Sequence, residues 1–347
     1  MAGGLPLCFY SRNLNAMTTP PEPFIAITMG DPAGSGAELI CKALANPSRL
    51  PKAPLLVVGD ASMMKKAATI TKSLNSVRAF QNPAEIHFEP ETIPVLDLQN
   101  VDPENHSYGV VRPEFGKAAY QYIVKAVELC RQGSAAAIVT SAINKESLNK
   151  AGYHFDGHTG LLSHLCEAKK VTMMLVADGL RICHVSTHVS LLEAIKRVRP
   201  ERILQVLQLA DDGIRRLGVS RPRLAVAGLN PHAGEDGLFG SEERDFIIPA
   251  LKRARAQGLN VAGPFAGDTV FFRAWKGEFD GVIAMYHDQG HVAAKMLGIW
   301  NGVNVTLGLP IIRTSVEHGT DFSNAGRGTS DPRSLLAAIR LAADMAS

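Results

Sequence analysis

Three short apolar runs, each leading into a histidine, constrain the architecture of this chain most strongly. The runs are residues 180–185, 224–229 and 281–285, and the histidines that follow them are His188, His232 and His287. Each run has the length and composition of a buried strand, and loop or helix-start residues come after it. Because the ligands of an open α/β sheet gather at the carboxyl ends of its strands, we expect the three histidines to reach one edge of a sheet.

Neutral imidazoles that converge on one point are the commonest protein ligands of divalent transition metals. A single histidine beside a strand, however, is more often an ordinary polar residue than a ligand. The three histidines are also far apart in the sequence and lack the close spacing of a linear metal motif. The pattern alone therefore leaves two interpretations open, one shared metal site or three separate polar side chains.

Strand-like and helix-like segments alternate along the chain. The expected strands are residues 24–28, 54–58, 93–98, 135–139, 171–177, 180–185, 223–229, 281–285 and 303–307. The main expected helices are residues 37–45, 113–132, 190–198, 201–217, 241–257 and 331–344, and Asp60 is expected to open a further helix. This alternation predicts an α/β fold with a largely parallel sheet, and a hairpin signal at Asp178-Gly179 makes the sheet mixed. We expect two α/β domains with a cleft between them.

Composition narrows the possible functions. The net charge of +3 is small, and no stripe of Lys and Arg with interleaved aromatic residues occurs, so nucleic acid is not an expected partner. No apolar run reaches the ~18 residues that span a bilayer, and residues 1–22 lack the apolar core of a signal peptide. The five cysteines are scattered, which predicts free thiols. We therefore expect a cytoplasmic protein without a membrane partner.

Two Gly-rich segments each precede a predicted helix. Residues 30–36 follow the first strand, where backbone N–H groups can face an anion or glycines can serve close packing. The GxGxxG fingerprint of dinucleotide sites is absent from this segment. Residues 318–331 form either a mobile surface loop or a cradle for a nucleotide. The sequence decides neither question.

Several polar residues are candidates for binding an anion. His158 and Thr159 precede a helix. They either cap this helix or present hydrogen-bond donors to an oxyanion. Lys295, Asn304 and Arg313 lie near apolar runs, where charged and amide side chains need a partner. Two cations and an amide make a suitable clamp for phosphate or carboxylate. The alternative is that the charged residues form structural ion pairs.

Several strings in a fixed order carry a family resemblance: GDPAGSG, GHTG, STH, GLNPHAGE, GDTVF, YHDQG, VNVTLGLPIIRTSVEHGT and AGRG. From about residue 24 to residue 345, the chain resembles the 4-hydroxythreonine-4-phosphate dehydrogenase family of vitamin B6 biosynthesis. The resemblance implies two α/β/α domains of the isocitrate and isopropylmalate dehydrogenase type, with the active site in the cleft. It also implies a homodimer whose active site uses both subunits.

The resemblance assigns roles by position. It implies a divalent metal, zinc or else magnesium, cobalt or manganese, on His188, His232 and His287. The substrate contacts that it implies are His158, Thr159, Lys295, Asn304 and Arg313. Asp268 and Asp288 match acidic residues near the metal and, with Lys295, are the catalytic candidates. The residues expected to bind NAD or NADP are His318, Gly319, Asn324, Gly326 and Asp331.

These roles predict an organisation of the chain and a reaction. Residues 23–150 with 300–347 would form the cofactor-side domain, and residues 151–299 the metal, substrate and dimerisation domain, after a flexible extension at 1–22. The metal would act as a Lewis acid while NAD or NADP takes the C3 hydride of 4-phospho-hydroxy-L-threonine. The resulting 3-oxo acid carries its carboxylate β to a ketone, so we expect it to lose CO₂.

Two departures from the family pattern leave other substrates open. His291 stands where the vitamin B6 enzymes tend to carry an apolar residue, and residues 184–190 look more like a sister branch that oxidises 4-phospho-D-threonate or 4-phospho-D-erythronate. A further relative acts on the cis-dihydrodiol of terephthalate. Asp321 lies where a small residue is common, which leaves the choice between NAD and NADP open. The alternatives from other classes are a metal-dependent hydrolase and a non-catalytic binding protein.

Overall fold

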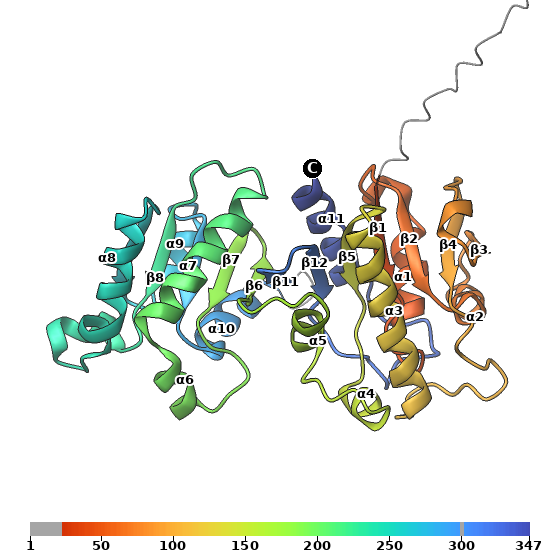
Figure 1. The fold of residues 1–347 in the computed structure, drawn as a ribbon, viewed down its shortest axis with the longest axis horizontal. Coiled ribbons are helices and arrows are strands. Elements are labelled where there is room, and N and C mark those ends of the chain that lie inside the picture. The colour runs from red at the N-terminus through yellow and green to blue at the C-terminus, as the bar shows by residue number, and fades with distance from the viewer. Residues whose placement is uncertain (1–22, 299–301) are drawn as a thin grey trace, which may run out of the picture.

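A single mixed sheet runs through the whole molecule. The computed structural model describes residues 23–298 and 302–347, so the predicted extension at 1–22 lies outside the described residues. The strand order is β3-β4-β2-β1-β5-β12-β11-β6-β7-β10-β8-β9. Figure 1 shows two halves of the molecule joined through β12, β11 and β6. The boundaries proposed for the two domains stay a prediction.

The first half of the chain builds one side of the sheet. Its strands are β1 (Phe24–Thr28), β2 (Leu55–Gly59), β3 (Ser76–Phe80), β4 (Thr92–Asp97) and β5 (Ala135–Thr140). Its helices are α1 (Gly36–Leu44), α2 (Ala61–Thr71), α3 (Pro113–Arg131), α4 (Lys145–Lys150) and α5 (His158–Leu165), with short 3-10 turns at Pro47–Arg49 and Pro83–Glu85. Helix α2 begins after Asp60 as expected, because the Asp60 carboxylate accepts from the backbone N–H groups of Ser62 and Met63.

The second half builds the other side and returns to the first. Its strands are β6 (Thr172–Ala177), β7 (Leu180–His184), β8 (Leu224–Ala227), β9 (Val261–Phe265), β10 (Gly281–Ala284), β11 (Val303–Leu307) and β12 (Ile312–Val316). Its α-helices are α6 (Leu191–Arg197), α7 (Pro200–Arg215), α8 (Ile248–Ala256), α9 (Val270–Trp275), α10 (His287–Leu297) and α11 (Arg333–Ala346). A tight turn, η3 (Pro231–Gly237), and a π-helical turn, η4 (Glu243–Ile247), lie between β8 and α8.

The pairing confirms the expected mixed sheet. Strands β6 and β7 form the predicted antiparallel hairpin, with Asp178 at φ 46° and Gly179 at φ 80° in its turn. Strand β11 runs antiparallel to both β6 and β12, whereas β12 runs parallel to β5. The last strands therefore carry the sheet from one half of the molecule into the other.

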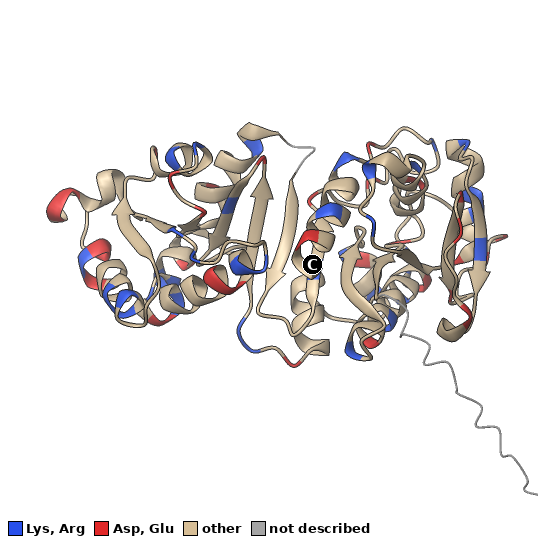
Figure 2. Ribbon diagram, turned by 90° about the horizontal axis from the view of Figure 1, so that it is seen from above, with Lys and Arg blue, Asp and Glu red and all other residues tan. Residues whose placement is uncertain are grey.

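The core forms because helices cover the sheet on both faces. All five residues of β1 are buried, as expected for a strand in the interior of a parallel sheet. Helix α3 packs against β1, β2 and β5, and α11 packs against β12, β5 and β11. No helix among residues 23–298 and 302–347 is long and apolar enough to cross a membrane. Figure 2 shows Lys and Arg interspersed with Asp and Glu over both halves.

Some elements differ from the expectations. Strands β3 and β9 and helix α9 were not predicted. Strand β3 lies at the edge of the sheet and is mostly exposed, so it lacks the apolar run that marks a buried strand. Strand β12 was expected to be part of a loop, because Arg313 and Thr314 interrupt its apolar pattern. The helix expected over residues 241–257 instead begins as the π-helical turn η4 and continues as α8.

Candidate functional site

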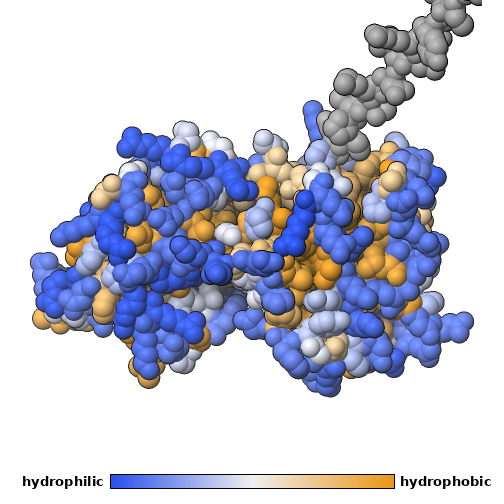
Figure 3. Space-filling view, in the orientation of Figure 1, coloured by the Kyte–Doolittle hydropathy of each residue, from blue (hydrophilic) through white to orange (hydrophobic). Residues whose placement is uncertain are grey.

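Residues from both halves line one polar cavity beside the middle strands. His158 begins α5, His188 follows β7, and Asn304 and Arg313 lie in β11 and β12. The cavity has a volume of about 320 Å³, and Thr159, Glu317, His318 and Gly319 are also among its lining residues. In the space-filling view, the surface is hollowed at the lower junction of the two halves, below an apolar area in the middle of the same face (Figure 3). The structure thus brings together four of the five predicted substrate contacts.

Arg313 is the most unusual residue of this cavity. Its side chain is only 2% exposed, and its guanidinium donates to the hydroxyls of Thr140 and Thr306. Arg313 forms no ion pair with any carboxylate of the described residues. Burial lowers the pKa of its guanidinium to about 9. A buried cation whose partners are only neutral hydroxyls favours an anionic ligand.

Several buried polar atoms in the same cavity have no hydrogen-bond partner among the described residues. They are His158 Nε2, Asn304 Oδ1, Glu317 Oε1 and His318 Nε2. Buried polar groups normally form hydrogen bonds, and leaving one unsatisfied costs about 1–3 kcal/mol. Burial also lowers the pKa of His158, aided by the charges of Arg313 and Lys145. The cavity therefore offers neutral donors and acceptors around a fixed positive charge.

His188 and His287 lie next to each other beside this cavity. Their ring centroids are 5.6 Å apart, and both residues line a neighbouring cavity of about 570 Å³. The Nδ1 of His287 lies 2.6 Å from Asp288 Oδ1, which orients the ring and leaves Nε2 free. Burial lowers the pKa of His188, and Lys145 and His287 lower it further. A neutral imidazole and a second one oriented by a carboxylate suit a divalent cation.

Two further histidines lie behind His287. The ring of His291 stacks on His287 with centroids 3.7 Å apart, and the ring of His184 lies 4.9 Å from that of His291. His184 is buried, and neither of its ring nitrogens has a hydrogen-bond partner among the described residues. Burial lowers the pKa of His184 to about 3 and that of His291 to about 4. Both rings are therefore neutral at physiological pH.

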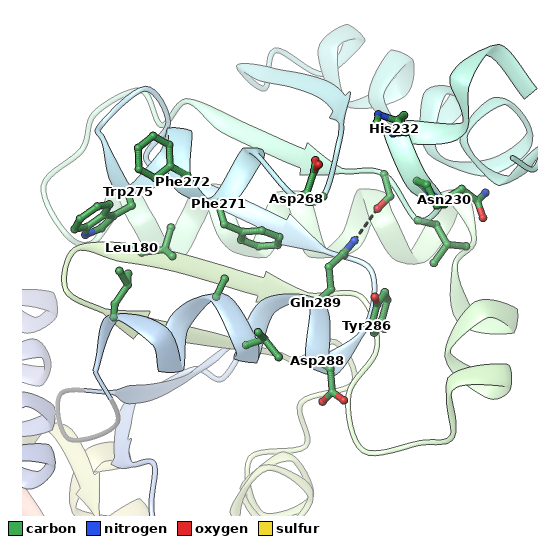
Figure 4. Close-up of a pocket in the computed structure, with 17 residues that line it drawn as sticks. Leu180, Asn230, His232, Asp268, Phe271, Phe272, Trp275, Tyr286, Asp288 and Gln289 are labelled. Carbon is green, nitrogen blue, oxygen red and sulfur yellow. Dashed lines mark hydrogen bonds between the residues drawn. The ribbon is translucent and has the colours of Figure 1, made fainter. Parts of the chain in front are cut away.

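His232, the third predicted metal ligand, lies apart from this pair. It lines a larger cavity of about 800 Å³ together with Asp268, Phe271 and Trp275 (Figure 4). Among residues 23–298 and 302–347, no three His, Cys, Asp or Glu side chains form a group that could hold a metal ion. The ligand assignment is therefore not assembled within one copy of the chain and stays a prediction.

The backbone around His232 is strained. His232, Ala233, Glu235 and Asp236 have φ angles between 42° and 54°, in the left-handed region that costs non-glycine residues roughly 1–2 kcal/mol each. The buried Glu243 holds the start of this turn: its carboxylate accepts from the N–H groups of residues 229 and 230 and from the Asn230 side chain. Strain of this kind persists where the surroundings enforce it, often at functional sites.

The predicted catalytic residues are dispersed. Asp268 and Asp288 are both among the lining residues of the larger cavity, but the Asp288 side chain is 79% exposed. Figure 4 shows the Asp288 carboxylate on the side of α10 that faces away from Asp268 and His232. Lys295, the fifth predicted substrate contact, does not line the Arg313 cavity, but its Nζ lies 3.9 Å from Glu317 Oε1. Neither aspartate lines the cavity that holds Arg313.

The predicted cofactor loop follows β12. His318 and Gly319 line the Arg313 cavity, whereas Asn324 donates to Asp321 and the Gly326 N–H donates to Glu38. Asp331 accepts from the N–H and side chain of Arg333. Asp321 accepts from Asn324 and from Ser330, so its carboxylate holds the loop together.

The first Gly-rich segment packs against this loop. Ser35 N–H donates to the Thr320 carbonyl, and a side chain at Gly34 would lie 2.8 Å from the same oxygen. A side chain at Gly36 would collide with the Met29 carbonyl. Close packing therefore explains these glycines, which was one of the two interpretations open from the sequence.

The sequence did not single out several residues that shape the site. They are Thr140, Lys145, Glu243, Thr306 and Glu317. Glu317 carried a usable signal, because an acidic residue directly follows a buried strand there and precedes the Gly-rich loop. The hydroxyls that bond Arg313 belong to β5 and β11, and only the tertiary fold brings them together.

The chain is similar to known proteins over most of its length. The chain matches the family described as pyridoxal phosphate biosynthetic protein PdxA over residues 51–342. It is 46% identical to a D-threonate 4-phosphate dehydrogenase of Cupriavidus necator, over 94% of this chain and 98% of that protein. It is 44% identical to a 4-hydroxythreonine-4-phosphate dehydrogenase of Trichlorobacter lovleyi, with the same coverage. The crystal structure of 4-hydroxythreonine-4-phosphate dehydrogenase from Klebsiella pneumoniae superposes with a TM-score of 0.87 at 43% identity, covering 94% of this chain and all of that one.

Proposed function

Because the chain belongs to the PdxA family, we propose that it is a dehydrogenase that oxidises the C3 hydroxyl of a 4-phosphorylated hydroxy acid, with NAD or NADP as hydride acceptor. D-threonate 4-phosphate is the first candidate substrate, because the relative named for it is 46% identical. 4-Hydroxythreonine 4-phosphate is the second candidate, because a relative named for it is 44% identical. The two compounds differ in the group on C2, a hydroxyl or an ammonium.

The observation that carries this proposal is the buried Arg313. Its guanidinium has only two neutral hydroxyl partners, so a phosphate or carboxylate of the substrate would supply the missing negative charge. His158, Thr159 and Asn304 line the same cavity and would fix the orientation of the substrate through hydrogen bonds. The charges of the whole molecule are nearly balanced, so attraction of an anion depends on this local arrangement.

A divalent cation fits the pair of histidines beside the cavity. His188 and His287 would hold it, since their rings are 5.6 Å apart and Asp288 orients the ring of His287. The cation would supply Lewis acidity toward the oxygen of the substrate. Two imidazoles are one ligand fewer than the usual three of a catalytic site, and His232 lies in another cavity.

A second copy of the chain would complete the site. The cavity of His232 is apolar at the other end, where the exposed Phe272, Trp275 and Val292 line it. Leu238, Phe239 and Met296 are further exposed apolar residues of this half of the molecule. An exposed apolar group of this kind favours association with another protein surface. In a symmetric dimer, each subunit would present His232 to the metal pair of its partner. This arrangement explains why one copy separates His232 from His188 and His287.

The chemistry that follows uses the residues of this chain to hold and orient the substrate. Arg313 and the nearby polar groups would bind the phosphate and carboxylate and so fix the position of the C3 carbon in the cavity. Hydride transfer leaves a ketone at C3, β to the carboxylate. Such a 3-oxo acid loses CO₂ readily, so we propose that decarboxylation follows oxidation and that His158 and Thr159 stabilise the enolate oxygen.

The direct test is the formation of NADH or NADPH by the purified protein with added Zn²⁺, Mn²⁺ or Mg²⁺. D-Threonate 4-phosphate, D-erythronate 4-phosphate and 4-hydroxythreonine 4-phosphate would be compared, together with the unphosphorylated acids. We expect turnover of a phosphorylated acid and at least tenfold weaker turnover of its unphosphorylated form. Turnover that does not depend on the phosphate would contradict the assignment of the Arg313 cavity.

Mixing two inactive variants tests the shared site. Each proposed site combines His188 of one subunit with His232 of the other, and His188→Ala and His232→Ala each remove one of these two residues. In a dimer of one variant with the other, one site lacks both residues and the second site is intact. After denaturation and refolding of an equal mixture, we expect about a quarter of the wild-type activity. A mixture as inactive as its components would show that the site is not shared.

A further inference from the structure

The Arg313 cavity contains a carboxylate whose role the binding scheme does not explain. Among the residues that line this cavity, only Asp156 and Glu317 are acidic. Asp156 is exposed, whereas the side chain of Glu317 is only 13% exposed. Glu317 directly follows β12, the strand that carries Arg313, so both residues enter the cavity from one rigid element.

The two oxygens of the Glu317 carboxylate have different surroundings. Oε2 lies against the backbone of Gly302, so closely that any side chain at position 302 would collide with it. Oε1 is buried and has no hydrogen-bond partner among the described residues, although Lys295 Nζ lies 3.9 Å away. The carboxylate is thus held in place while one oxygen keeps its capacity to accept a proton.

The electrostatics of the surroundings suit a proton acceptor. Burial raises the pKa of Glu317, and the charges of Lys295 and His287 on α10 lower it in part. The other titratable groups that line the cavity are Lys145, Asp156, His158, His188, Arg313 and His318. A base works best when its pKa is raised toward the working pH, provided that it lies within reach of the proton.

We propose that Glu317 is the catalytic base of the proposed dehydrogenase and accepts the proton of the C3 hydroxyl through Oε1. This inference rests on the proposed function. The O–H bond of the alcohol breaks and its proton moves to Glu317, while the C3–H bond breaks and the hydride moves to the nicotinamide ring. The carbon–oxygen double bond forms in the same step. Glu317 then releases its proton to solvent, so the sum is alcohol plus NAD(P)⁺ giving ketone, NAD(P)H and one proton.

The predicted catalytic acids are less well placed for this step. Asp268 lines the cavity of His232, so within one copy of the chain it lies outside the Arg313 cavity. Asp288 is largely exposed, and one of its oxygens already lies 2.6 Å from His287 Nδ1. In the Arg313 cavity itself, Glu317 is the acidic side chain that is shielded from solvent.

The test replaces Glu317 with glutamine, which keeps the shape of the side chain but cannot accept the proton. We expect kcat to fall by roughly 100- to 10,000-fold with little change in the KM of either substrate. The decrease of kcat/KM toward low pH should disappear in Glu317→Gln and persist at reduced rate in Glu317→Asp. Glu128→Gln on the surface of α3 is the matched control and should keep the wild-type rate and pH profile.

A second variant tests the coupling between Lys295 and Glu317. Lys295→Met removes a charge that lowers the pKa of Glu317, so the acidic limb of kcat/KM should move to higher pH, whatever happens to KM. A merely structural glutamate would leave the limb where it is. A primary isotope effect on kcat with C3-deuterated substrate should be larger in Glu317→Gln than in the wild type, because the chemical step then limits turnover.

The outcomes separate this inference from the proposed function. If the wild type reduces NAD or NADP with a phosphorylated acid and Glu317→Gln keeps the acidic limb, the assignment of the base is overturned while the proposed function stands. Loss of the limb in Asp268→Asn or Asp288→Asn instead of Glu317→Gln would also overturn it. If the wild type oxidises no phosphorylated hydroxy acid under any condition, both proposals fail.

Discussion

Replacing Arg313 with methionine should separate substrate binding from the stability of the fold. Burial lowers the pKa of the guanidinium from 12.5 to about 9, which corresponds to an unfavourable free energy on the order of 5 kcal/mol for its charged form. Because the pKa is lower in the folded than in the unfolded chain, this cost is fully present at neutral pH. It is relieved only as the pH rises above about 9.

The expected magnitudes follow from the partners of Arg313. Methionine fills much of the same space without a charge, but the hydroxyls of Thr140 and Thr306 lose a donor, at about 1 kcal/mol each. The free enzyme should therefore gain about 3 kcal/mol of stability. The variant also loses a buried charged contact with the substrate, which costs roughly 2–5 kcal/mol. The KM for the phosphorylated substrate should rise about 30-fold or more, with the KM of the cofactor unchanged.

The assay combines urea unfolding and steady-state kinetics on the same preparations. Inorganic phosphate should stabilise the wild type against urea and leave Arg313→Met unaffected, since only a ligand that binds the folded state adds stability. Arg340→Met on the exposed side of α11 serves as the control and should change neither quantity. A variant that is less stable than the wild type and keeps its KM would show that Arg313 is a structural residue.

Three further changes test other parts of the structure. Burial raises the pKa of Asp31 from its ordinary value of 3.8 to about 6, so the folded state loses stability as the pH rises between these two values. Asp31→Asn should therefore add about 2–3 kcal/mol to the free energy of unfolding at pH 7.5, and urea unfolding at pH 5 should show a smaller gain. A gain that does not depend on pH would contradict this reasoning. Glu243→Ala should cost about 2–4 kcal/mol in urea unfolding, because the backbone N–H groups of Leu229 and Asn230 lose their acceptor, and Glu243→Gln should recover part of the loss. Gly179→Ala should cost about 1 kcal/mol, because φ is 80° in the β6–β7 turn, and calorimetry that finds no destabilisation would refute this use of the glycine.

The parts of the fold that follow from local chemistry were predictable. The buried run of β1, the cap of α2 by Asp60 and the turn at Asp178-Gly179 depend on neighbouring residues, and the structure confirms each of them. Strand β12 was missed because its polar residues are buried by pairing with β5 and β11 and by bonds to Arg313. Segments that are distant in the sequence create this environment, so no local sequence pattern predicts it.

In the candidate site, too, some features were predictable from the local sequence and others depend on tertiary contacts. The expectation that a charged or amide side chain beside an apolar run needs a partner led to Asn304 and Arg313, and the position before a helix led to His158; the fold places all three around one cavity. The sequence did not predict that His232 follows β8 in a turn with left-handed backbone angles. The sign of φ at these four non-glycine residues depends on the tertiary contacts of Glu243. Glu317 was also missed, because its burial depends on Gly302 and the neighbouring strands.

The buried charges of Arg313 and Glu317 lower the stability of the folded chain, and they indicate the chemistry of the ligand more directly than the sequence motifs do. A chain selected only for stability would pair Arg313 with a carboxylate and give Glu317 Oε1 a hydrogen-bond donor. Among residues 23–298 and 302–347, however, Arg313 has only neutral partners and Glu317 Oε1 has no hydrogen-bond partner. The two residues are four positions apart in the sequence, in and directly after β12, and both line the cavity in which one substrate could reach them. A phosphorylated hydroxy acid would satisfy both residues. Its phosphate would supply a negatively charged partner for Arg313, and its hydroxyl carries a proton that Glu317 can accept. The cost in stability and the capacity for catalysis therefore have the same physical origin.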